Sequence, residues 1–242
     1  MRAKSRALKI AYFQGLYKRY SRLDFTRSYD RPFAIAGLEK RLQVAFDSKG
    51  SYGTFDDSDK ANPGLFHRSL LWQRECDGDN DRFLKIIDFP TDRNVHIPSW
   101  SWMAYEGGID YCDPPFQTAD WEMKEIVSPW SERPTAEGVP EMENLALSVT
   151  VHDFDLRGRG QNDVKLFYDT SQTTASNGTR SRCVIVARSK VGRSEREKTY
   201  YVLLVGATGD FTVNGEKVYK RLGAGFMLGK YVTLDGDIGK VY

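Results

Sequence analysis

Three aromatic side chains and two carboxylates in one short segment have the types and the spacing of a binding face. Residues 98–106 read Pro-Ser-Trp-Ser-Trp-Met-Ala-Tyr-Glu, Gly107 and Gly108 follow, and residues 109–113 read Ile-Asp-Tyr-Cys-Asp. Two extended runs joined by Gly-Gly are typical of a β-hairpin, because glycine accepts the positive φ of a tight turn. Pairing of Glu106 with Ile109 would place five candidate residues on one face of this hairpin. They are Trp100, Trp102, Glu106, Tyr111 and Asp113.

This hairpin face has two interpretations. Aromatic rings edged by carboxylates can bind sugars or cationic groups, and two carboxylates at a suitable separation can hydrolyse a glycoside. Alternatively, the tryptophans pack in the core, and Glu106 and Asp113 lie at its wet ends. We favour packing, because Trp is large and mostly buried in globular folds. A carbohydrate-binding or hydrolytic module is the alternative.

The histidines and cysteines have neither the spacing of a metal site nor that of a catalytic pair. His67, His96 and His152 are scattered, and no Cys-x-x-Cys motif occurs. His96 and Cys112 are close enough in sequence to meet across a sheet. The hairpin register, however, places Cys112 opposite Met103, which indicates a buried structural thiol. We therefore predict no metal, no cofactor and no catalytic residue, and the balance favours a protein that is not an enzyme.

The composition argues against two classes of function. The 242 residues can bury a sizeable core, and 35 basic against 33 acidic residues give a formal net charge of +2. A chain so close to neutral is not typical of a nucleic-acid-binding protein, which needs a basic face. No run approaches the roughly 20 apolar residues that span a bilayer, so we expect no membrane span.

The expected compartment is the cytoplasm. Three cysteines, far apart and odd in number, fit free thiols in a reducing compartment, and the chain has no apolar segment of secretory type at its start. The first acidic residue is Asp24, and a basic, acid-free start also resembles a mitochondrial transit peptide. We favour an ordinary first helix, because aromatic residues in its apolar stripe suit core packing.

The front of the chain has helical periodicity. An apolar stripe recurs every four residues at Leu8, Tyr12, Leu16 and Tyr20. A second helix is expected after a cap at Thr26 or Ser28, with Pro32 in its first turn. Its predicted apolar face comprises Ala34, Leu38, Leu42 and Ala45. A short third helix should bring four further side chains to the core: Leu65, Phe66, Leu70 and Trp72.

The back of the chain has the pattern of β-strands. Apolar residues alternate with polar ones, as in half-buried strands, or form short continuous runs, as in buried ones. The predicted strands are 145–151, 164–168, 183–187, 200–205 and 231–234. Asn214-Gly215 is a favoured two-residue hairpin turn, which predicts that Phe211 faces Val218.

Together these patterns predict an α+β fold, with N-terminal helices packed on a mainly antiparallel β-sheet that ends in a C-terminal β-meander. Residues 1–113 would form a helical segment with the Trp-rich hairpin, and residues 141–242 a β-rich segment. Residues 114–140 contain scattered prolines and are the expected connection. The three parts can also form one continuous domain.

Four segments, in a fixed order, carry a resemblance to a known family. Tyr-Ser-Arg-Leu-Asp-Phe-Thr at 20–26 precedes Asp-Arg-Pro-Phe-Ala-Ile-Ala-Gly-Leu at 30–38, and Gly-Leu-Phe at 64–66 precedes Leu-Leu-Trp at 70–72. The most specific segment is Pro-Ser-Trp-Ser-Trp at 98–102, followed by Gly-Gly-Ile. Tyr-Lys-Arg-Leu-Gly-Ala-Gly at 219–225 is the last. They resemble the region C-terminal to the HET domain of fungal heterokaryon-incompatibility proteins.

The resemblance implies a role in signalling and supplies no catalytic residue. The family's N-terminal domain, which is associated with triggering cell death on nonself contact, carries a Tyr-x-x-Leu-Ser-Tyr-x-Trp-Gly type motif and an Asp-x-x-Cys-Ile-Asn-Gln type motif. Neither occurs here. Phe33 and Phe66 stand where the family usually has Leu and Trp, which are packing swaps. The resemblance therefore implies a non-catalytic accessory or regulatory segment, or a truncated gene product, that acts through a protein partner in intracellular nonself recognition or defence.

Overall fold

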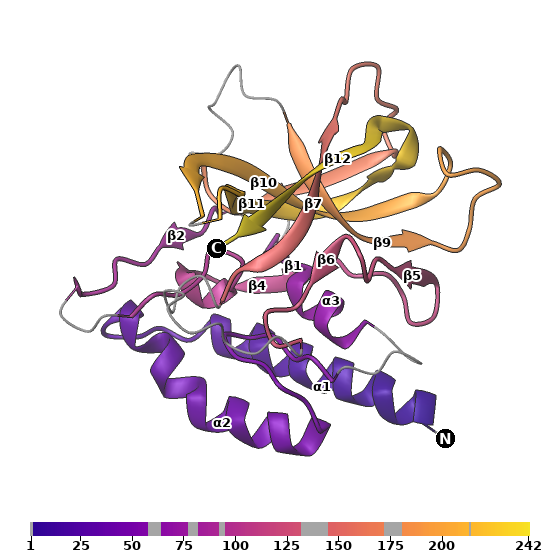
Figure 1. Ribbon diagram of the computed structural model, residues 1–242. Helices are drawn as coiled ribbons and strands as arrows, with labels where there is room; N and C mark the ends of the chain where they lie inside the picture. Colours follow the sequence, from indigo (N-terminus) through magenta and orange to yellow (C-terminus); the bar gives the residue numbers. More distant parts are fainter. Residues whose placement is uncertain are drawn as a thin grey trace.

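The chain folds into three layers (Figure 1). The computed structural model describes residues 2–57, 64–76, 82–91, 95–131, 145–171, 181–212 and 214–242. Two long N-terminal helices form the first layer, short strands and a third helix form a thin middle layer, and a barrel-like closed β-sheet forms the third. The α+β class predicted from the sequence is confirmed.

The first helix, α1 (Arg2–Ser21), buries a different face from the predicted one. Ile10, Phe13 and Tyr17 lie in the core, whereas Leu8 and Tyr12 are 71% and 59% exposed. The other two members of the predicted stripe are half-buried. The predicted stripe is wrong because side chains spaced strictly four residues apart move by about 40° per step around a helix with 3.6 residues per turn. Spacings that mix three and four stay on one side.

The second helix, α2 (Arg31–Phe46), follows a single 3-10 turn, η1 (Ser28–Asp30), and has Pro32 in its first turn as predicted. Its N-cap residue is Asp30, whose side chain makes no capping hydrogen bond, so the predicted caps at Thr26 and Ser28 are wrong. Of the predicted apolar face, only Leu42 is buried, and the helix turns a neighbouring face towards the core. The buried residues are Arg31, Pro32, Ile35, Glu39, Leu42 and Phe46.

Within the described part of the chain, no helix is long and apolar enough to cross a membrane.

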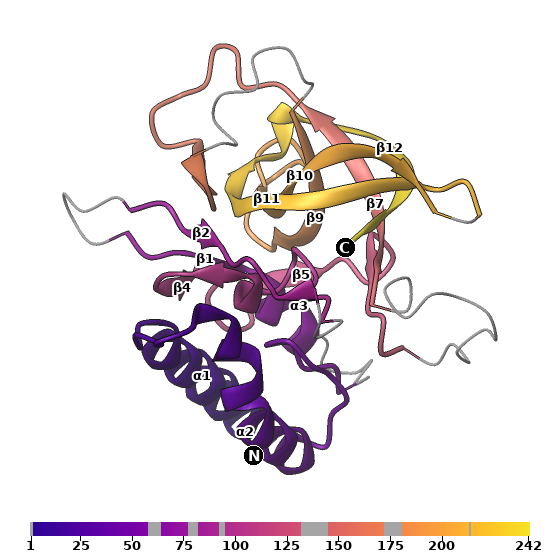
Figure 2. The same cartoon turned by 90° about the vertical axis from the view of Figure 1, so that its left-hand side faces the viewer.

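The middle layer consists of four short strands and a helix. Strand β1 (Trp72–Arg74) pairs with β4 (Ile109–Tyr111), and β2 (Lys85–Ile86) pairs with β3 (Tyr105–Glu106), both antiparallel. Helix α3 (Leu65–Leu70) precedes β1 and is buried throughout, which confirms the predicted third helix. Figure 2 shows β1, β2 and β4 between the two long helices and the barrel.

The predicted Trp-rich hairpin does not form. Trp102 lies in a 3-10 turn, η3 (Trp102–Ala104), and β3 and β4 pair with other strands rather than with each other. The Ile109 N–H, which would close the hairpin on Glu106, instead donates to Ser21 Oγ at 2.9 Å. The end of α1 therefore takes the backbone donor that the hairpin needs. Gly107 and Gly108 lead the chain from one small sheet to the other.

In the described part of the chain, the third layer is a barrel of five strands with three more at its edges. Its strands pair in the order β5-β9-β10-β11-β12-β7-β6, β8 pairs with β11, and the pairing of β7 with β9 closes the ring. All pairs are antiparallel except β11 with β12, so the predicted C-terminal β-meander ends at β11. The strands are β5 (Ala119–Trp121), β6 (Ile126–Val127), β7 (Leu147–Phe154), β8 (Val164–Tyr168), β9 (Arg182–Ser189), β10 (Thr199–Phe211), β11 (Lys217–Leu228) and β12 (Val232–Val241).

The strands predicted in the back half are confirmed, with two shifts. Phe211 pairs with Lys217 rather than with Val218, so the hairpin loop is longer than the predicted two-residue turn. The last strand begins only at Val232, because Gly229–Tyr231 forms a 3-10 turn, η5, before it. The expected connection at 114–140 contributes β5 and β6 to the large sheet, while its residues 132–140 lie outside the described chain.

The sequence predicted that the N-terminal helices pack directly on the large sheet, and they do not. Their buried side chains share a core with Phe55, from the segment after α2, and with Trp72 and Trp102 of the middle layer. A second core joins α3 and Trp100 to the inner faces of the barrel strands. A third core fills the other end of the barrel, around Tyr200 and Met227. The middle layer therefore separates the helices from the barrel and contributes to both cores that it borders.

Two tyrosines of α1 test the observed helix face directly. Tyr17→Ala should lower the free energy of unfolding by about 3–5 kcal/mol, because a fully buried aromatic ring is lost. Tyr12→Ala, the matched control on the exposed side, should change it by no more than about 0.5 kcal/mol. Chemical denaturation followed by circular dichroism measures both. A larger loss of unfolding free energy for Tyr12→Ala than for Tyr17→Ala would contradict the assignment of Tyr17 to the buried face of α1.

Candidate functional site

The five residues predicted to share one binding face do not share a surface. Trp100 and Trp102 are 0% and 1% exposed, and they lie in different cores, with the barrel and with the helices respectively. The Trp100 Nε1 donates to the carbonyl of Leu145 at 3.1 Å, and the Tyr111 ring meets Phe13 edge-on at 6.0 Å. These aromatic residues pack the interior, and no aromatic platform results.

The two carboxylates of the predicted face also lie in separate environments. Glu106 is exposed and accepts a hydrogen bond from Ser28 Oγ at 2.9 Å. Asp113 forms an ion pair with Arg68, whose guanidinium lies 4.8 Å from the centre of the Trp121 ring. Because each carboxylate has its own partner on a different element, they do not form the acid and base of a hydrolytic pair.

His67, Cys112 and Cys183 lie where general acid–base or thiolate chemistry is unfavourable. Among the described residues, no cluster of His, Cys, Asp or Glu could hold a metal ion. Burial lowers the pKa of His67 to about 4, against a smaller opposing effect of the Glu122 backbone. Burial raises the pKa of the Cys112 thiol to about 12, and also raises that of the fully buried Cys183. Both thiols are therefore protonated at neutral pH, as structural cysteines are.

The strongest polar feature is a fully buried ion pair between the barrel and the middle layer. Arg221 on β11 is 0% exposed at its side chain and Asp169, just after β8, is 1% exposed. The Arg221 Nε donates to Asp169 Oδ2 at 2.9 Å, and Nη1 donates to the carbonyl of Leu70 at 2.7 Å. Nη2 donates to the carbonyl of Trp72 at 2.5 Å. One barrel side chain thus satisfies backbone oxygens of α3 and β1.

The Arg221 side chain also stacks on an aromatic ring. Its guanidinium carbon lies 3.3 Å from the centre of the Trp72 ring, and the Trp72 Nε1 donates to the carbonyl of Trp100 at 2.9 Å. The Arg221 backbone N–H donates to Ser99 Oγ at 3.0 Å, and Ser99 Oγ in turn donates to the carbonyl of Tyr242. Residues from three distant segments and the C-terminus therefore meet around one guanidinium.

The contact between the barrel and the middle layer around Arg221 and Asp169 is called the junction below, and both the backbone and the side chain of Asp169 are hydrogen-bonded in it. Its backbone N–H donates to the carbonyl of Leu222 at 2.9 Å, and its carbonyl accepts from the N–H of Leu84 at 2.8 Å. Burial raises the pKa of the Asp169 carboxyl, and the charge and hydrogen bond of Arg221 oppose this shift. A buried carboxylate keeps its charge only when such a partner is in place.

A cavity of about 660 Å³ opens beside this ion pair, between the middle layer and the barrel. Ile86 and Tyr105 line it from β2 and β3, and Leu204, Lys220 and Leu222 line it from the barrel. This volume is in the range of small-molecule pockets, which often lie at the mouths of β-barrels. Slightly more than half of its wall is apolar, and polar and charged side chains form the rest.

Sequence reasoning missed the ion pair although one partner lay within a recognised segment. Arg221 is the arginine of the 219–225 segment, which we used only for the family resemblance. An arginine in a strand of small and apolar residues is a signal of a buried cation. Asp169 follows a strand directly, where an aspartate is ordinary turn chemistry, so the sequence offers no comparable signal for it.

The comparisons with known proteins identify no relative. No family model, no curated protein and no solved structure matches this chain.

The buried ion pair predicts a strong coupling between its two partners. Arg221→Met should lower the free energy of unfolding by about 3–5 kcal/mol, because it leaves the Asp169 charge buried and unpaired. The double variant with Asp169→Leu should be more stable than the sum of the two single variants predicts, by about 2 kcal/mol. Urea denaturation of all four proteins measures this difference. Simple addition of the two single effects would contradict the pair's role.

His67 predicts a pH dependence of stability. Its pKa is about 4 in the folded chain and about 6.5 in an unfolded one, so the unfolded state binds more protons between these values. Stability should be unaffected above pH 6.5 and should fall by about 3 kcal/mol as the pH drops to 4. His67→Gln should remove this part of the pH dependence, whereas the exposed His96→Gln should keep it. Equal pH slopes for wild type and His67→Gln would contradict the assignment.

Proposed function

We propose that this chain is a non-catalytic accessory or regulatory segment of a heterokaryon-incompatibility-like protein that acts in cytoplasmic nonself recognition or defence signalling. The observation that carries the proposal is the convergence of the four segments that resemble the family. They are separated by up to about two hundred residues, yet each contributes to the contacts between the layers of one structure.

The first segment contacts the middle layer through Arg31 and Tyr20. The Arg31 Nη1 donates to the carbonyl of Tyr105 at 2.9 Å, and Nη2 donates to that of Ser21 at 2.9 Å. The Tyr20 hydroxyl donates to the carbonyl of Arg31 at 2.7 Å, and its ring packs against Trp102 of the third segment at 6.0 Å. Residues that match the family pattern thus fix the helices to the middle layer.

The other three segments meet at the buried ion pair. Trp72 from the second segment stacks on Arg221 from the fourth, while Ser99 and Trp100 from the third accept hydrogen bonds from Arg221 and Trp72. A pattern that is preserved for packing would consist of such residues, because each has a partner in another segment. A chance resemblance gives no reason for its residues to meet.

A regulatory role also agrees with the chemistry of the described residues. Two thiols are protonated, His67 is neutral and buried, and each carboxylate of the predicted face has a separate partner. A segment of this kind would act by binding a protein partner. The enzyme or carbohydrate-binding alternative depended on the Trp-rich hairpin, which does not form, so we do not propose it.

Expression in a filamentous fungus tests this function. The chain alone should leave viability unchanged, and co-expression with a HET-domain protein should shift the dose of that protein that kills half the cells. A vital dye measures the dead fraction. The Arg221→Met variant, which should be strongly destabilised, is the control and should shift the dose less than the wild-type chain. Death caused by the chain alone, or an unchanged dose with the folded chain, would contradict the proposal.

A further inference from the structure

The cavity beside the ion pair has the wall of a binding site for an apolar molecule. Its volume is about 660 Å³, and its apolar lining comes from both the middle layer and the barrel. The apolar residues are Ile86, Ile87, Phe89, Ile97, Ala104, Phe154, Leu204, Val205, Ala207 and Leu222. Pockets with this size and lining bury most of the surface of a small organic ligand.

A β-bulge shapes the barrel side of this cavity. Leu204 pairs with Gly223 and Val205 pairs with Arg221, so Leu222 between them has no partner on β10. Gly206 lies next to the bulge, and a Cβ there would lie 2.9 Å from Leu222 Cδ1. Bulges redirect side chains at barrel rims and binding sites. Here the bulge and the glycine let Leu222 line the cavity while Arg221 points into the layer interface.

The charges that line the cavity leave one cation uncompensated. Among the described residues, three cations and one carboxylate contribute to the wall. Asp169 forms an ion pair with Arg221, and Arg182 forms one with Asp153 at 3.2 Å. Lys220 is exposed and forms no ion pair among the described residues. A ligand with one anionic group would place that group at Lys220.

An exposed isoleucine marks the opposite edge of the cavity. Ile86 on β2 lines the cavity and is 64% exposed. Ile87, its neighbour in the chain, is buried and also contributes to the wall. An apolar ligand body lying across the cavity towards β2 would cover the Ile86 side chain and remove its apolar surface from water.

We propose that this cavity binds a free small molecule that has an apolar body and a single anionic group. The apolar body lies between Ile86 and Leu222, and the anion is bound by Lys220. This inference does not rest on the proposed regulatory function, because it uses only the geometry and charges of the cavity.

Fluorescence titration with 1-anilinonaphthalene-8-sulfonate at neutral pH tests the proposal, because this probe combines aromatic rings with one sulfonate. Saturable binding is expected, and Lys220→Glu should weaken it by about tenfold or more. N-phenyl-1-naphthylamine has the same rings without the sulfonate, and its affinity should not change with Lys220→Glu. No saturable binding of the sulfonate up to about 1 mM would overturn the proposal.

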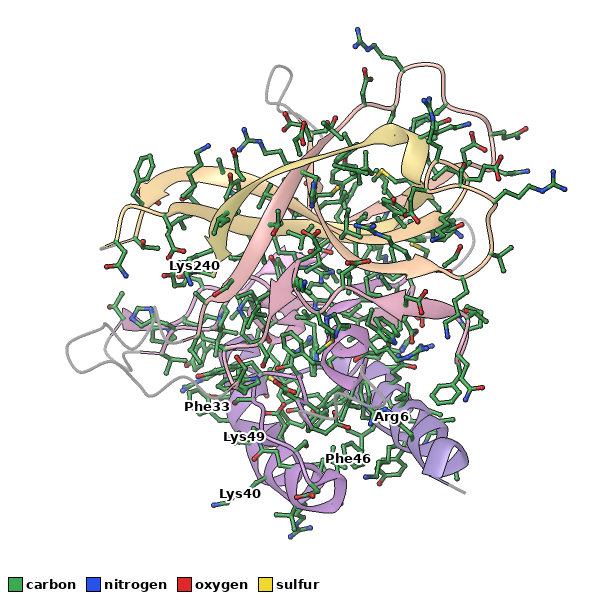
Figure 3. All side chains as sticks on the ribbon, turned by 45° about the vertical axis from the view of Figure 1, so that its right-hand side comes forward. Arg6, Phe33, Lys40, Phe46, Lys49 and Lys240 are labelled. Atoms are coloured by element: carbon green, nitrogen blue, oxygen red, sulfur yellow. The ribbon has the colours of Figure 1, made fainter. Side chains whose placement is uncertain are left out.

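Two matched controls separate the cavity from the rest of the surface. Figure 3 shows Lys40 on α2, on the side of the molecule away from the barrel, and it does not line the cavity, so Lys40→Glu makes the same charge change without effect on binding. Ile86→Ser should weaken binding of both probes, whereas Ile238→Ser, at a strand position that is 71% exposed and outside the cavity, should not. All four positions are exposed, so the variants should fold, which thermal melting checks. Equal effects within either pair would overturn the proposal.

Discussion

A guanidinium and a carboxylate that are both removed from water must find all their partners inside the protein, and Arg221 and Asp169 do so at the centre of this fold. The guanidinium uses its donors on the carboxylate and on the carbonyls of Leu70 and Trp72. Those carbonyls belong to the middle layer, whereas Arg221 belongs to the barrel. The barrel can therefore keep this charge buried only while the middle layer stays docked against it, and the two layers depend on each other for that reason.

The layered arrangement follows from this constraint and from the cores on either side of it. The middle layer contains little regular structure of its own, since its strands have only two or three residues. Short strand pairs are marginal in isolation, so they need the helical core on one side and the barrel core on the other. The cavity lies where this thin layer and the bulged strand β11 leave a space. The junction that joins the layers thus also fixes the cavity wall.

Much of the fold was predictable because its strongest patterns are local. The alternation in residues 145–151 and the apolar run at 183–187 identified β7 and β9 correctly, since each pattern reflects burial against its own neighbours. Barrel closure was not predictable, because it depends on the pairing of β7 with β9, which no local pattern specifies. The hairpin failed for a similar reason: Ser21, far away in the sequence, takes the Ile109 amide. The candidate site was mostly missed, because the meeting of Arg221 and Asp169 is a property of the assembled layers.

Native-state hydrogen exchange tests most directly whether the buried junction makes the middle layer and the barrel one cooperative unit. The amide of Leu84, bonded to Asp169 O, reports on the junction, and the amide of Val184 reports on the barrel core. If the layers unfold together, both amides should reach the same opening free energy and the same dependence on denaturant as global unfolding is approached. A Leu84 amide that opens at clearly lower free energy, on its own denaturant dependence, would contradict the account.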